Sequence, residues 1–303
     1  MKVLAIIVTY NGAQWIQKCI SSLMENTLVP EILIVDNAST DNTLEIVSKD
    51  FPTVEIIKSR ENLGFGKANN IGLKKALEEQ MDYAFLLNQD AWADPNTIEK
   101  LIEVAEKNRI FGVLCPMNFL PGKKELEWYF SCYIGAEKCP GFVSDLACGQ
   151  VKDIYSLPFV NAAAWLVSRA CIEEVGGFDP IFPHYGEDED YCMRVLYKQL
   201  KVGIVPGAEI VHDINFKSWD QIKVDPIRQR IINFIELKNL NNSFRFLKFN
   251  FVKSRLERLS SLLLTRRLKE FKFMSKIMFS TIRLIPAISH SRKVSKQKSS
   301  FLK

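Results

Sequence analysis

The chain has no apolar segment long enough to cross a membrane and no closely paired cysteines. Within its 303 residues, no window of 18 consecutive residues is both apolar and uncharged, which argues against a simple transmembrane helix. The seven cysteines are odd in number and include no CxxC pair, so we expect a reducing compartment and no disulfide framework. Cys132, Cys139 and Cys148 are too widely spaced for a zinc knuckle. The first apolar run is too short for a signal peptide.

The glycine fingerprint of dinucleotide-binding proteins is also missing. Gly64 and Gly66 are followed by Asn69 at the position where a GxGxxG pattern requires its third glycine. These glycines let the backbone approach a pyrophosphate closely. We therefore do not expect a nicotinamide-dependent dehydrogenase.

Acidic residues are scarce only in the last fifth of the chain. Residues 241–303 hold 16 Lys and Arg but only two acids, Glu257 and Glu270, so this segment carries +14. Residues 1–240 carry −9, although the whole chain is +5. We predict a domain at residues 1–240, followed by a separate basic tail at residues 241–303.

Aromatic and aliphatic residues are interleaved with the bases of this tail. The pattern predicts a basic amphipathic helical segment that binds a membrane surface. The same charge would attract nucleic acid, or an acidic protein surface such as the domain of this chain. The polar end, residues 289–300, is predicted to be disordered.

Residues 1–115 alternate between strand-like and helical patterns. Short β-branched apolar runs occupy residues 3–8, 31–35, 54–58 and 83–87, and helical spacing separates them. This alternation predicts an α/β fold with a Rossmann-like, mostly parallel sheet flanked by helices. Ligands bind such sheets beyond the carboxyl ends of the strands. All four predicted strands end there in polar residues, any one of which could be turn chemistry but which together predict a binding rim.

A run of four acids, Glu187, Asp188, Glu189 and Asp190, precedes a segment with one-faced helical spacing. One interpretation places these acids in the first helical turn, where the helix dipole favours negative charge. The other makes one of them a general base that faces a cleft. The irregular stretch at residues 111–160 is long enough to carry function.

These motifs, taken in order, resemble those of family 2 glycosyltransferases with the GT-A fold, most of all the rhamnosyltransferase-type members. The matching segments are residues 8–11, 35–41, 62–66 with Asn69 and Asn70, 87–90, 176–179, 187–190 with Arg194, and 211–212. The resemblance covers about residues 1–240. It implies a nucleotide-sugar-binding half at residues 1–115 and an acceptor and catalytic half at residues 116–240.

The resemblance implies a nucleotide-sugar donor, with UDP- or dTDP-sugars expected, whose base lies near Thr9, Tyr10 and Asp36. Asp36 can accept a hydrogen bond from a base or ribose, although a turn cap would explain it too. The expected donor site comprises Thr9, Tyr10, Asn11, Asp36, Asn37, Asn62, Gly64, Asn69, Asn88, Gln89 and Asp90.

Asp90 stands where the family's DxD motif places its metal-binding carboxylate, so the resemblance implies a bound Mg²⁺ or Mn²⁺. His212 matches the family's third ligand position, and imidazole suits Mn²⁺ better than Mg²⁺. Asn88 replaces the first Asp of the motif, which lowers the local negative charge.

Asp188 then takes the role of general base, with Glu187 as the second candidate. Attack by the activated hydroxyl on the anomeric carbon would invert its configuration. Trp165, Tyr185 and Asp190 are the expected acceptor residues. Core packing explains Trp165 nearly as well, and Asp190 could instead pair with Arg194 to orient the start of the helix.

The sequence lacks the Gln-x-x-Arg-Trp motif that marks processive synthases of this family, so transfer of one sugar per encounter is expected. The hypothesis is an inverting, metal-dependent glycosyltransferase acting on a glycan or lipid-linked saccharide in surface polysaccharide or glycolipid biosynthesis. It would lie in the cytoplasm at the inner face of the membrane. A catalytically silent sugar-nucleotide binder or membrane-surface scaffold is the main alternative. A nucleic-acid partner is not expected, because the main domain is acidic.

Overall fold

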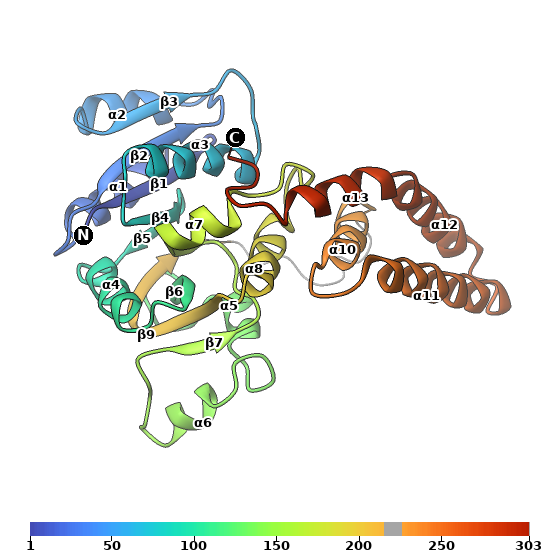
Figure 1. Cartoon of the computed structure of the whole chain (residues 1–303). Helices are drawn as coiled ribbons and strands as arrows, with labels where there is room; N and C mark the ends of the chain where they lie inside the picture. Colours follow the sequence, from blue (N-terminus) through green and yellow to red (C-terminus); the bar gives the residue numbers. More distant parts are fainter. Residues whose placement is uncertain (215–225, 303) are drawn as a thin grey trace.

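The computed structural model describes residues 1–214 and 226–302, which form an α/β domain and a helical C-terminal region (Figure 1). The elements of the α/β domain are β1 (Val3–Thr9), α1 (Ile16–Met24), β2 (Glu31–Asp36), α2 (Thr43–Asp50), β3 (Glu55–Lys58), α3 (Phe65–Glu78), β4 (Tyr83–Asn88), β5 (Ala91–Ala93), α4 (Thr97–Lys107), β6 (Phe111–Phe119), α5 (Trp128–Tyr133), α6 (Phe142–Ala147), β7 (Tyr155–Leu157), β8 (Ala164–Ser168), α7 (Arg169–Val175), α8 (Glu187–Tyr197) and β9 (Lys201–His212). The C-terminal region contains α10 (Pro226–Lys238), α11 (Phe244–Leu264), α12 (Leu268–Arg283) and α13 (Ile285–Val294).

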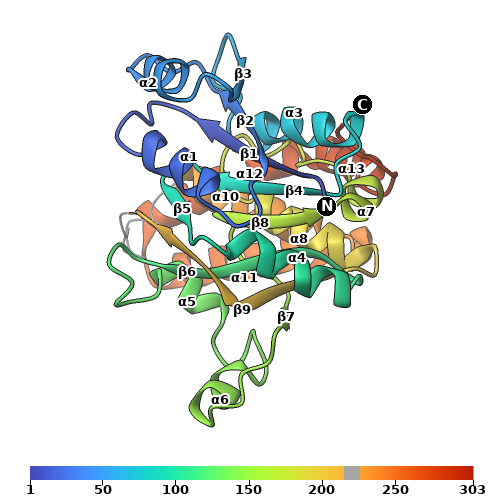
Figure 2. The same cartoon turned by 90° about the vertical axis from the view of Figure 1, so that its left-hand side faces the viewer.

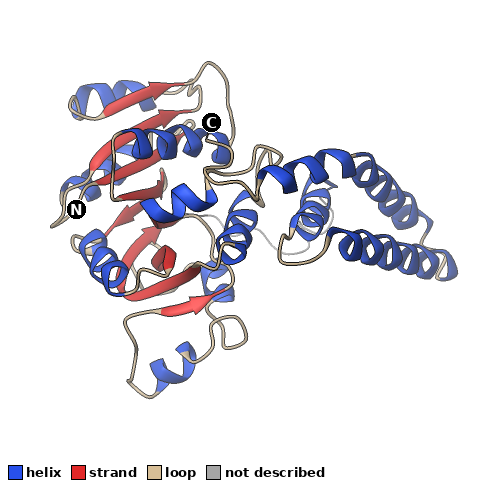
Figure 3. Ribbon diagram, in the orientation of Figure 1, coloured by secondary structure: helices blue, strands red, loops and turns tan. Residues whose placement is uncertain are grey.

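One sheet runs through the α/β domain in the order β3-β2-β1-β4-β8-β6-β9-β5, and β7 pairs with β9 (Figures 2 and 3). The predicted α/β class is confirmed. Strands β3, β2, β1 and β4 are parallel, as are β6 and β9, whereas β8, β5 and β7 pair antiparallel with their neighbours. Strand β9 is the longest of them and runs without a break from Lys201 to His212.

Both faces of the sheet are apolar and covered by helices. Along β1, Leu4 and Ile6 pack with α3, α7 and α8, whereas Ala5 and Ile7 pack with α1, α2 and α4. Successive side chains of a strand point to opposite faces, so a strand buried on both sides reads as a continuous apolar run. This is why the strands of the N-terminal half are visible in the sequence.

The C-terminal helices have a small core of their own. Phe234, Leu247, Phe251, Met278 and Ile288 pack together in it, and Phe182 from the α/β domain joins them. Figure 1 shows α11 and α12 as a hairpin that extends away from the sheet. Among the helices that the structure describes, none is long and apolar enough to span a bilayer.

The end of the chain returns to the α/β domain, so the predicted disorder of residues 289–300 is wrong. Part of this segment lies in α13, and Ser295, Ser300 and Leu302 are buried. The amide of Gly177 donates to the carbonyl of Ser300 at 2.7 Å. Gly176 has φ +87°, and a Cβ there would lie 2.0 Å from the Ser300 oxygen, so only glycine fits this contact. The sequence did not reveal this packing because the serines and lysines of residues 289–300 form no apolar periodic pattern. The residues that they contact lie far away in the sequence.

Candidate active site

The carboxyl ends of β1, β2 and β4 meet at one edge of the sheet, as predicted. Gln89 ties two of the loops together there, since its Oε1 accepts from the amide of Tyr10 at 3.0 Å and its Nε2 donates to the Tyr10 carbonyl at 3.2 Å. Asn11 accepts from the amide of Thr40 at 2.8 Å, which links the loops after β1 and β2. The rim is therefore held in place by its own polar residues.

A cavity of about 690 Å³ opens on this rim, and we call it the donor cavity. Seven of the predicted donor residues line it: Tyr10, Asn37, Asn62, Gly64, Asn88, Gln89 and Asp90. Lys67 lines it as well and was missed by the sequence reasoning. Its position in the first turn of α3 was the available signal, because a helix N-terminus with a nearby cation suits phosphate.

Asn37 and Gly64 shape the wall of this cavity. The Asn37 side chain accepts from the Leu63 amide at 3.0 Å and donates to the Gly64 carbonyl at 3.2 Å. Gly64 has φ +79°, and a Cβ there would lie 2.3 Å from the carbonyl oxygen of Pro183. The loop that contains Gly64 thus packs closely on the segment that leads into α8.

Thr9, Asp36 and Asn69 support the rim but do not line the cavity. Asp36 is 1% exposed, and its carboxylate accepts from the Thr9 hydroxyl at 3.0 Å and the Ser39 amide at 3.1 Å. The Asn69 side chain donates to the Phe65 carbonyl within α3 at 3.0 Å. These bonds match the turn-cap alternative for Asp36, and the three side chains lie beneath the surface that a donor would touch.

Asp90 and His212 lie side by side because β5 pairs antiparallel with β9, with Ala91 opposite His212. Their nearest atoms, Asp90 Oδ1 and His212 Nε2, are 3.5 Å apart, and Asn88 Nδ2 lies 3.4 Å from the same ring nitrogen. His212 is 2% exposed, and its Nδ1 has no hydrogen-bond partner among the described residues.

This pair fits a divalent cation only as a partial ligand set. Over residues 1–214 and 226–302, no group of three or more His, Cys, Asp or Glu side chains could hold a metal. Mg²⁺ and Mn²⁺ are commonly held by one or two carboxylates together with substrate phosphates and water. Asp90 and His212 would supply the protein's share of such a site.

A second cavity of about 530 Å³ adjoins the first, and we call it the acceptor cavity. The two cavities share Asn88, Phe65 and His184 in their walls. Glu187, Asp188 and Glu189 line the acceptor cavity at the start of α8. His212 lines the acceptor cavity together with the predicted base Asp188, whereas Asp90 lines the donor cavity, so the predicted metal ligands lie where the two cavities meet.

Burial raises the pKa values of three acids of this run, Glu187, Asp188 and Glu189. Burial raises the pKa of Asp188 to about 6, although the Glu189 amide donates to its Oδ1 at 2.8 Å. Burial and then the charge of Asp188 raise the pKa of Glu187 further, and the Glu187 Oε2 is buried without a partner. Burial, followed by Asp188, raises the pKa of Glu189 to about 7. A carboxylate with a pKa near working pH is suited to general base catalysis.

Replacing Glu187 with Gln is expected to stabilise the protein at pH 8 but not at pH 4. A carboxyl whose pKa is raised by folding destabilises the fold once pH exceeds its unfolded pKa, and this cost grows up to the folded pKa. Removing the charge should raise Tm by roughly 3–6 °C at pH 8. Thermal melts across this pH range measure the effect, and Glu45→Gln, in the exposed first turn of α2, is the control. Equal changes in the two variants would contradict the prediction.

Two predicted acceptor residues lie in the protein interior instead. Trp165 is fully buried and stacks on Phe178, with ring centroids 6.2 Å apart, so the core-packing alternative is correct. Asp190 is 1% exposed and pairs with Arg194 at 2.8 Å, so it holds α8 in place and does not face the cavity. Tyr185 is 42% exposed and lines the acceptor cavity, and its role in acceptor binding stays a prediction.

Other residues of the acceptor cavity come from two segments that the sequence reasoning did not resolve. The irregular stretch before β8 provides Tyr129, Tyr133, Phe159 and Asn161. Asn161 Oδ1 is buried without a partner among the described residues. Helix α10 provides Arg228, Ile231, Ile232 and Ile235. The aromatic residues of the irregular stretch were the only available signal, because the isoleucines of α10 reach the cavity only through tertiary packing.

Comparison with known proteins shows which family the N-terminal part of the chain resembles. Residues 4–141 match the model for glycosyl transferase family 2. This part of the chain is therefore similar to family 2 glycosyltransferases. The chain is 25% identical over 228 residues to an N-acetylglucosaminyl-diphospho-decaprenol L-rhamnosyltransferase of Mycobacterium tuberculosis, covering 68% of this chain and 74% of the relative. It is 27% identical over 251 residues to the dTDP-rhamnosyl transferase RfbF of Shigella flexneri, covering 82% of this chain and 80% of the relative.

Solved structures share the fold of this chain. S. aureus TarS 1–349 in complex with UDP-GlcNAc has a TM-score of 0.60 at 16% identity, covering 98% of this chain and 88% of that one. GalNAc-T7 with UDP, GalNAc and Mn²⁺ has a TM-score of 0.59 at 15% identity, covering 80% of this chain and 52% of that one. At these identities the likeness establishes the GT-A fold alone.

Proposed function

We propose that this glycosyltransferase transfers a single sugar, with inversion, from a nucleotide-sugar donor to a hydroxyl of a glycan or lipid-linked saccharide. The observation that carries the proposal is the meeting of the donor and acceptor cavities at Asn88. Asp90 faces one cavity and Asp188 the other, so a donor's anomeric carbon and an acceptor hydroxyl could meet between them.

The donor is proposed to be a UDP- or dTDP-sugar. The N-terminus of α3, with Gly64 and Lys67, would bind its phosphates, because helix N-termini and cations both favour anions. The name of the S. flexneri relative specifies a dTDP-rhamnosyl donor, and one of the TarS structures contains UDP-GlcNAc. Together they support these two nucleotides.

Asp90 and His212 would hold a Mg²⁺ or Mn²⁺ ion between the protein and the donor phosphates. When bound, the ion would neutralise the charge that develops on the departing nucleoside diphosphate. The unpartnered Nδ1 of His212 leaves the tautomer free to present Nε2 as a ligand.

Asp188 would accept the proton of the acceptor hydroxyl as that oxygen attacks the anomeric carbon. Its raised pKa matches this task, because a stronger acid would be a weaker base. Glu187 remains the second candidate, although burial and then the charge of Asp188 raise its pKa further and favour the protonated form, which cannot act as a base.

The acceptor would lie against aromatic and aliphatic side chains of the acceptor cavity, which suit the apolar faces of sugars. The decaprenol-linked acceptor named for the M. tuberculosis relative supports a lipid-linked saccharide. We infer that the protein works in the cytoplasm at the inner face of the membrane, held there by its basic C-terminal region, in the synthesis of a surface polysaccharide or glycolipid.

A catalytically silent sugar-nucleotide binder is the second candidate. Asn88 favours it, because an amide replaces a carboxylate beside the proposed metal. Slow hydrolysis of the donor in the absence of acceptor separates the two functions, since only an active transferase should release the nucleotide.

A thermal-shift panel of UDP-, dTDP- and GDP-sugars, with and without Mn²⁺, tests the proposal. Tm is expected to rise by several degrees only when one nucleotide and the metal are both present, because ligands that bind the native state stabilise it. Asp90→Asn should remove the metal requirement together with most of the shift. Asp50→Asn, an exposed change at the end of α2, should leave both unchanged. No shift with any nucleotide would count against a donor site.

A further inference from the structure

Helices α11 and α12 form a hairpin whose far end lies well away from the active site (Figure 1). The hairpin is joined to the rest of the protein through α10 and α13, whose apolar side chains share one core with it. Residues Thr265, Arg266 and Arg267 connect the two helices, and Arg266 adopts a left-handed backbone with φ +55°. We call residues 263–269 the hairpin tip.

Leucines are exposed at the hairpin tip. Leu264 is 85% exposed, Leu268 57% and Leu263 49%. Arg266, Arg267 and Lys269 lie among these leucines. A monomeric soluble surface rarely gathers bulky apolar side chains at its outermost point, and such clusters mark binding surfaces.

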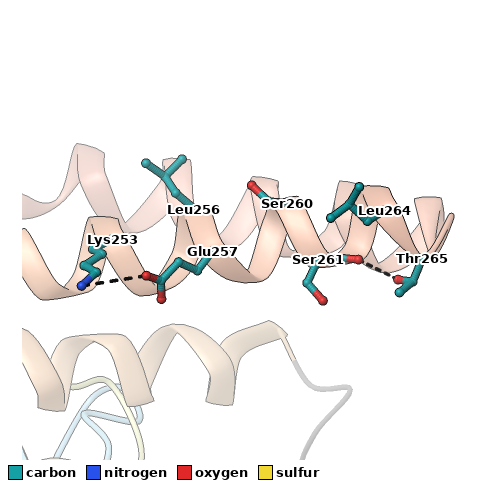
Figure 4. A pocket seen from close by; sticks show the side chains of 7 residues that line it. All are labelled: Lys253, Leu256, Glu257, Ser260, Ser261, Leu264 and Thr265. Carbon is teal, nitrogen blue, oxygen red and sulfur yellow. Dashed lines mark hydrogen bonds and ion pairs between the residues drawn. The ribbon is translucent and has the colours of Figure 1, made fainter.

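The apolar surface continues along α11. Leu247, Phe251 and Leu262 are buried against the other helices, but Phe246, Phe249 and Leu256 are each more than half exposed. Helix α11 is therefore apolar on both its inner and its outer side. In Figure 4, Leu256 and Leu264 project from the same side of the helix, beside a shallow groove of about 610 Å³.

The charge of the hairpin has one sign. Residues 244–283 contain eleven Lys and Arg and two acids. Each acid pairs with a base close to it in the sequence, since Glu257 lies 4.0 Å from Lys253 and Glu270 lies 2.5 Å from Arg267. Little negative charge is left to oppose binding to an anionic surface.

We propose that this hairpin docks on an anionic lipid bilayer, with the leucines of its tip entering the interface between headgroups and acyl chains. Basic side chains are attracted to anionic headgroups, and burying exposed leucines and phenylalanines in the interface lowers the free energy. A bilayer interface provides both of these contributions. Nucleic acid would account for the positive charge but not for the exposed leucines. The inference rests on the proposed function, in which a lipid-linked acceptor is located in the membrane and the enzyme must reach it there.

Co-sedimentation of the full chain with lipid vesicles tests the inference without donor or acceptor. Vesicles of phosphatidylcholine with about 30% phosphatidylglycerol are compared with pure phosphatidylcholine vesicles. Replacing Leu264 and Leu268 together with Glu should lower the partition coefficient on anionic vesicles at least about tenfold. Leu146→Glu is the matched control, because Leu146 on α6 is 57% exposed, like Leu268, and should change binding by less than about twofold.

Three results would overturn the inference: no binding to anionic vesicles, equal partition of the tip and control variants, or equal binding to neutral and anionic vesicles. Binding to single-stranded nucleic acid that the leucine changes leave intact, without vesicle binding, would assign the hairpin to nucleic acid instead. The nucleotide-dependent thermal shift is measured on the same variants. If that shift persists while vesicle binding fails, the membrane inference alone is lost.

Discussion

Asp188→Asn is expected to lower kcat by roughly 10²–10⁴-fold while donor binding stays close to that of the wild type. Asn has nearly the same shape as Asp but cannot accept the proton of the acceptor hydroxyl. The cavity wall should survive, because the Asn side-chain oxygen can still accept from the Glu189 amide, which lies 2.8 Å from Asp188 Oδ1. Steady-state kinetics with saturating donor measure kcat, and the nucleotide-dependent thermal shift measures donor binding.

The pH profile of the wild type gives an independent test of the same assignment. Because burial raises the pKa of Asp188 to about 6, kcat should fall as pH drops through this value, about two pH units higher than for an ordinary aspartate. Glu189→Gln, on the same helical turn, should change kcat by less than about tenfold. Normal turnover in Asp188→Asn combined with no turnover in Glu187→Gln would transfer the base role to Glu187.

Lys238→Met is expected to destabilise the fold by about 3–5 kcal/mol, because it removes a buried cation from its anionic partners. Lys238 is 1% exposed, and its Nζ lies 2.5 Å from Asp179 and 3.5 Å from Asp190. The same ammonium donates to the hydroxyls of Ser291 and Ser295 at 2.6 and 2.8 Å. Without it, the buried Asp179 carboxylate would lose its opposite charge.

This cluster joins the C-terminal helices to α8, the helix that carries the proposed base. Asp190 lies on α8, two residues after the proposed base, and also accepts from Arg194 at 2.8 Å. Arg194 in turn donates to the carbonyls of Val175 and Gly177 at 3.0 and 2.8 Å. Removal of Lys238 should therefore loosen both the docking of α10 and the position of α8.

Thermal or denaturant unfolding measures the loss, which should lower Tm by roughly 10 °C. Lys298→Met is the matched control, because Lys298 pairs with Glu174 at the surface, where solvent screens such pairs and they contribute little to stability. Adding Asp179→Asn to Lys238→Met should recover part of the lost stability, since the uncompensated charge is then absent. Similar melting temperatures for Lys238→Met and Lys298→Met would show that the buried cluster contributes little.

Sequence patterns alone predicted the N-terminal half of the fold and most of the donor rim. Strand β1 can be predicted from the sequence because both of its faces are buried, so Leu4 on one face and Ile7 on the other are both apolar. The position of Asn37 and Gln89 at the rim can be predicted because polar residues that directly follow buried parallel strands lie at one edge of the sheet. Both signals, a continuous apolar run and a polar residue directly after it, involve residues that are adjacent in the chain. Sequence patterns therefore reveal them.

Trp165 and Asp190 show where local patterns fail. A tryptophan near the end of a strand and an acid in a charged run look the same in sequence whether they face a cavity or the core. Trp165 faces the core because it stacks on Phe178. Asp190 lies in the interior because Arg194 and Lys238 neutralise its charge there. Only the folded chain brings these partners together.

The sequence by itself therefore determined the fold class, the family motifs, the identity of the acidic run and the positive charge of the C-terminal region. The tertiary structure decided which acids face the acceptor cavity, that α10 forms one of its walls, and that the chain end packs beside Gly176. The physical reason is that strand and helix periodicity follows from local backbone geometry. Burial, pKa shifts and ion pairing arise from contacts between residues far apart in the chain.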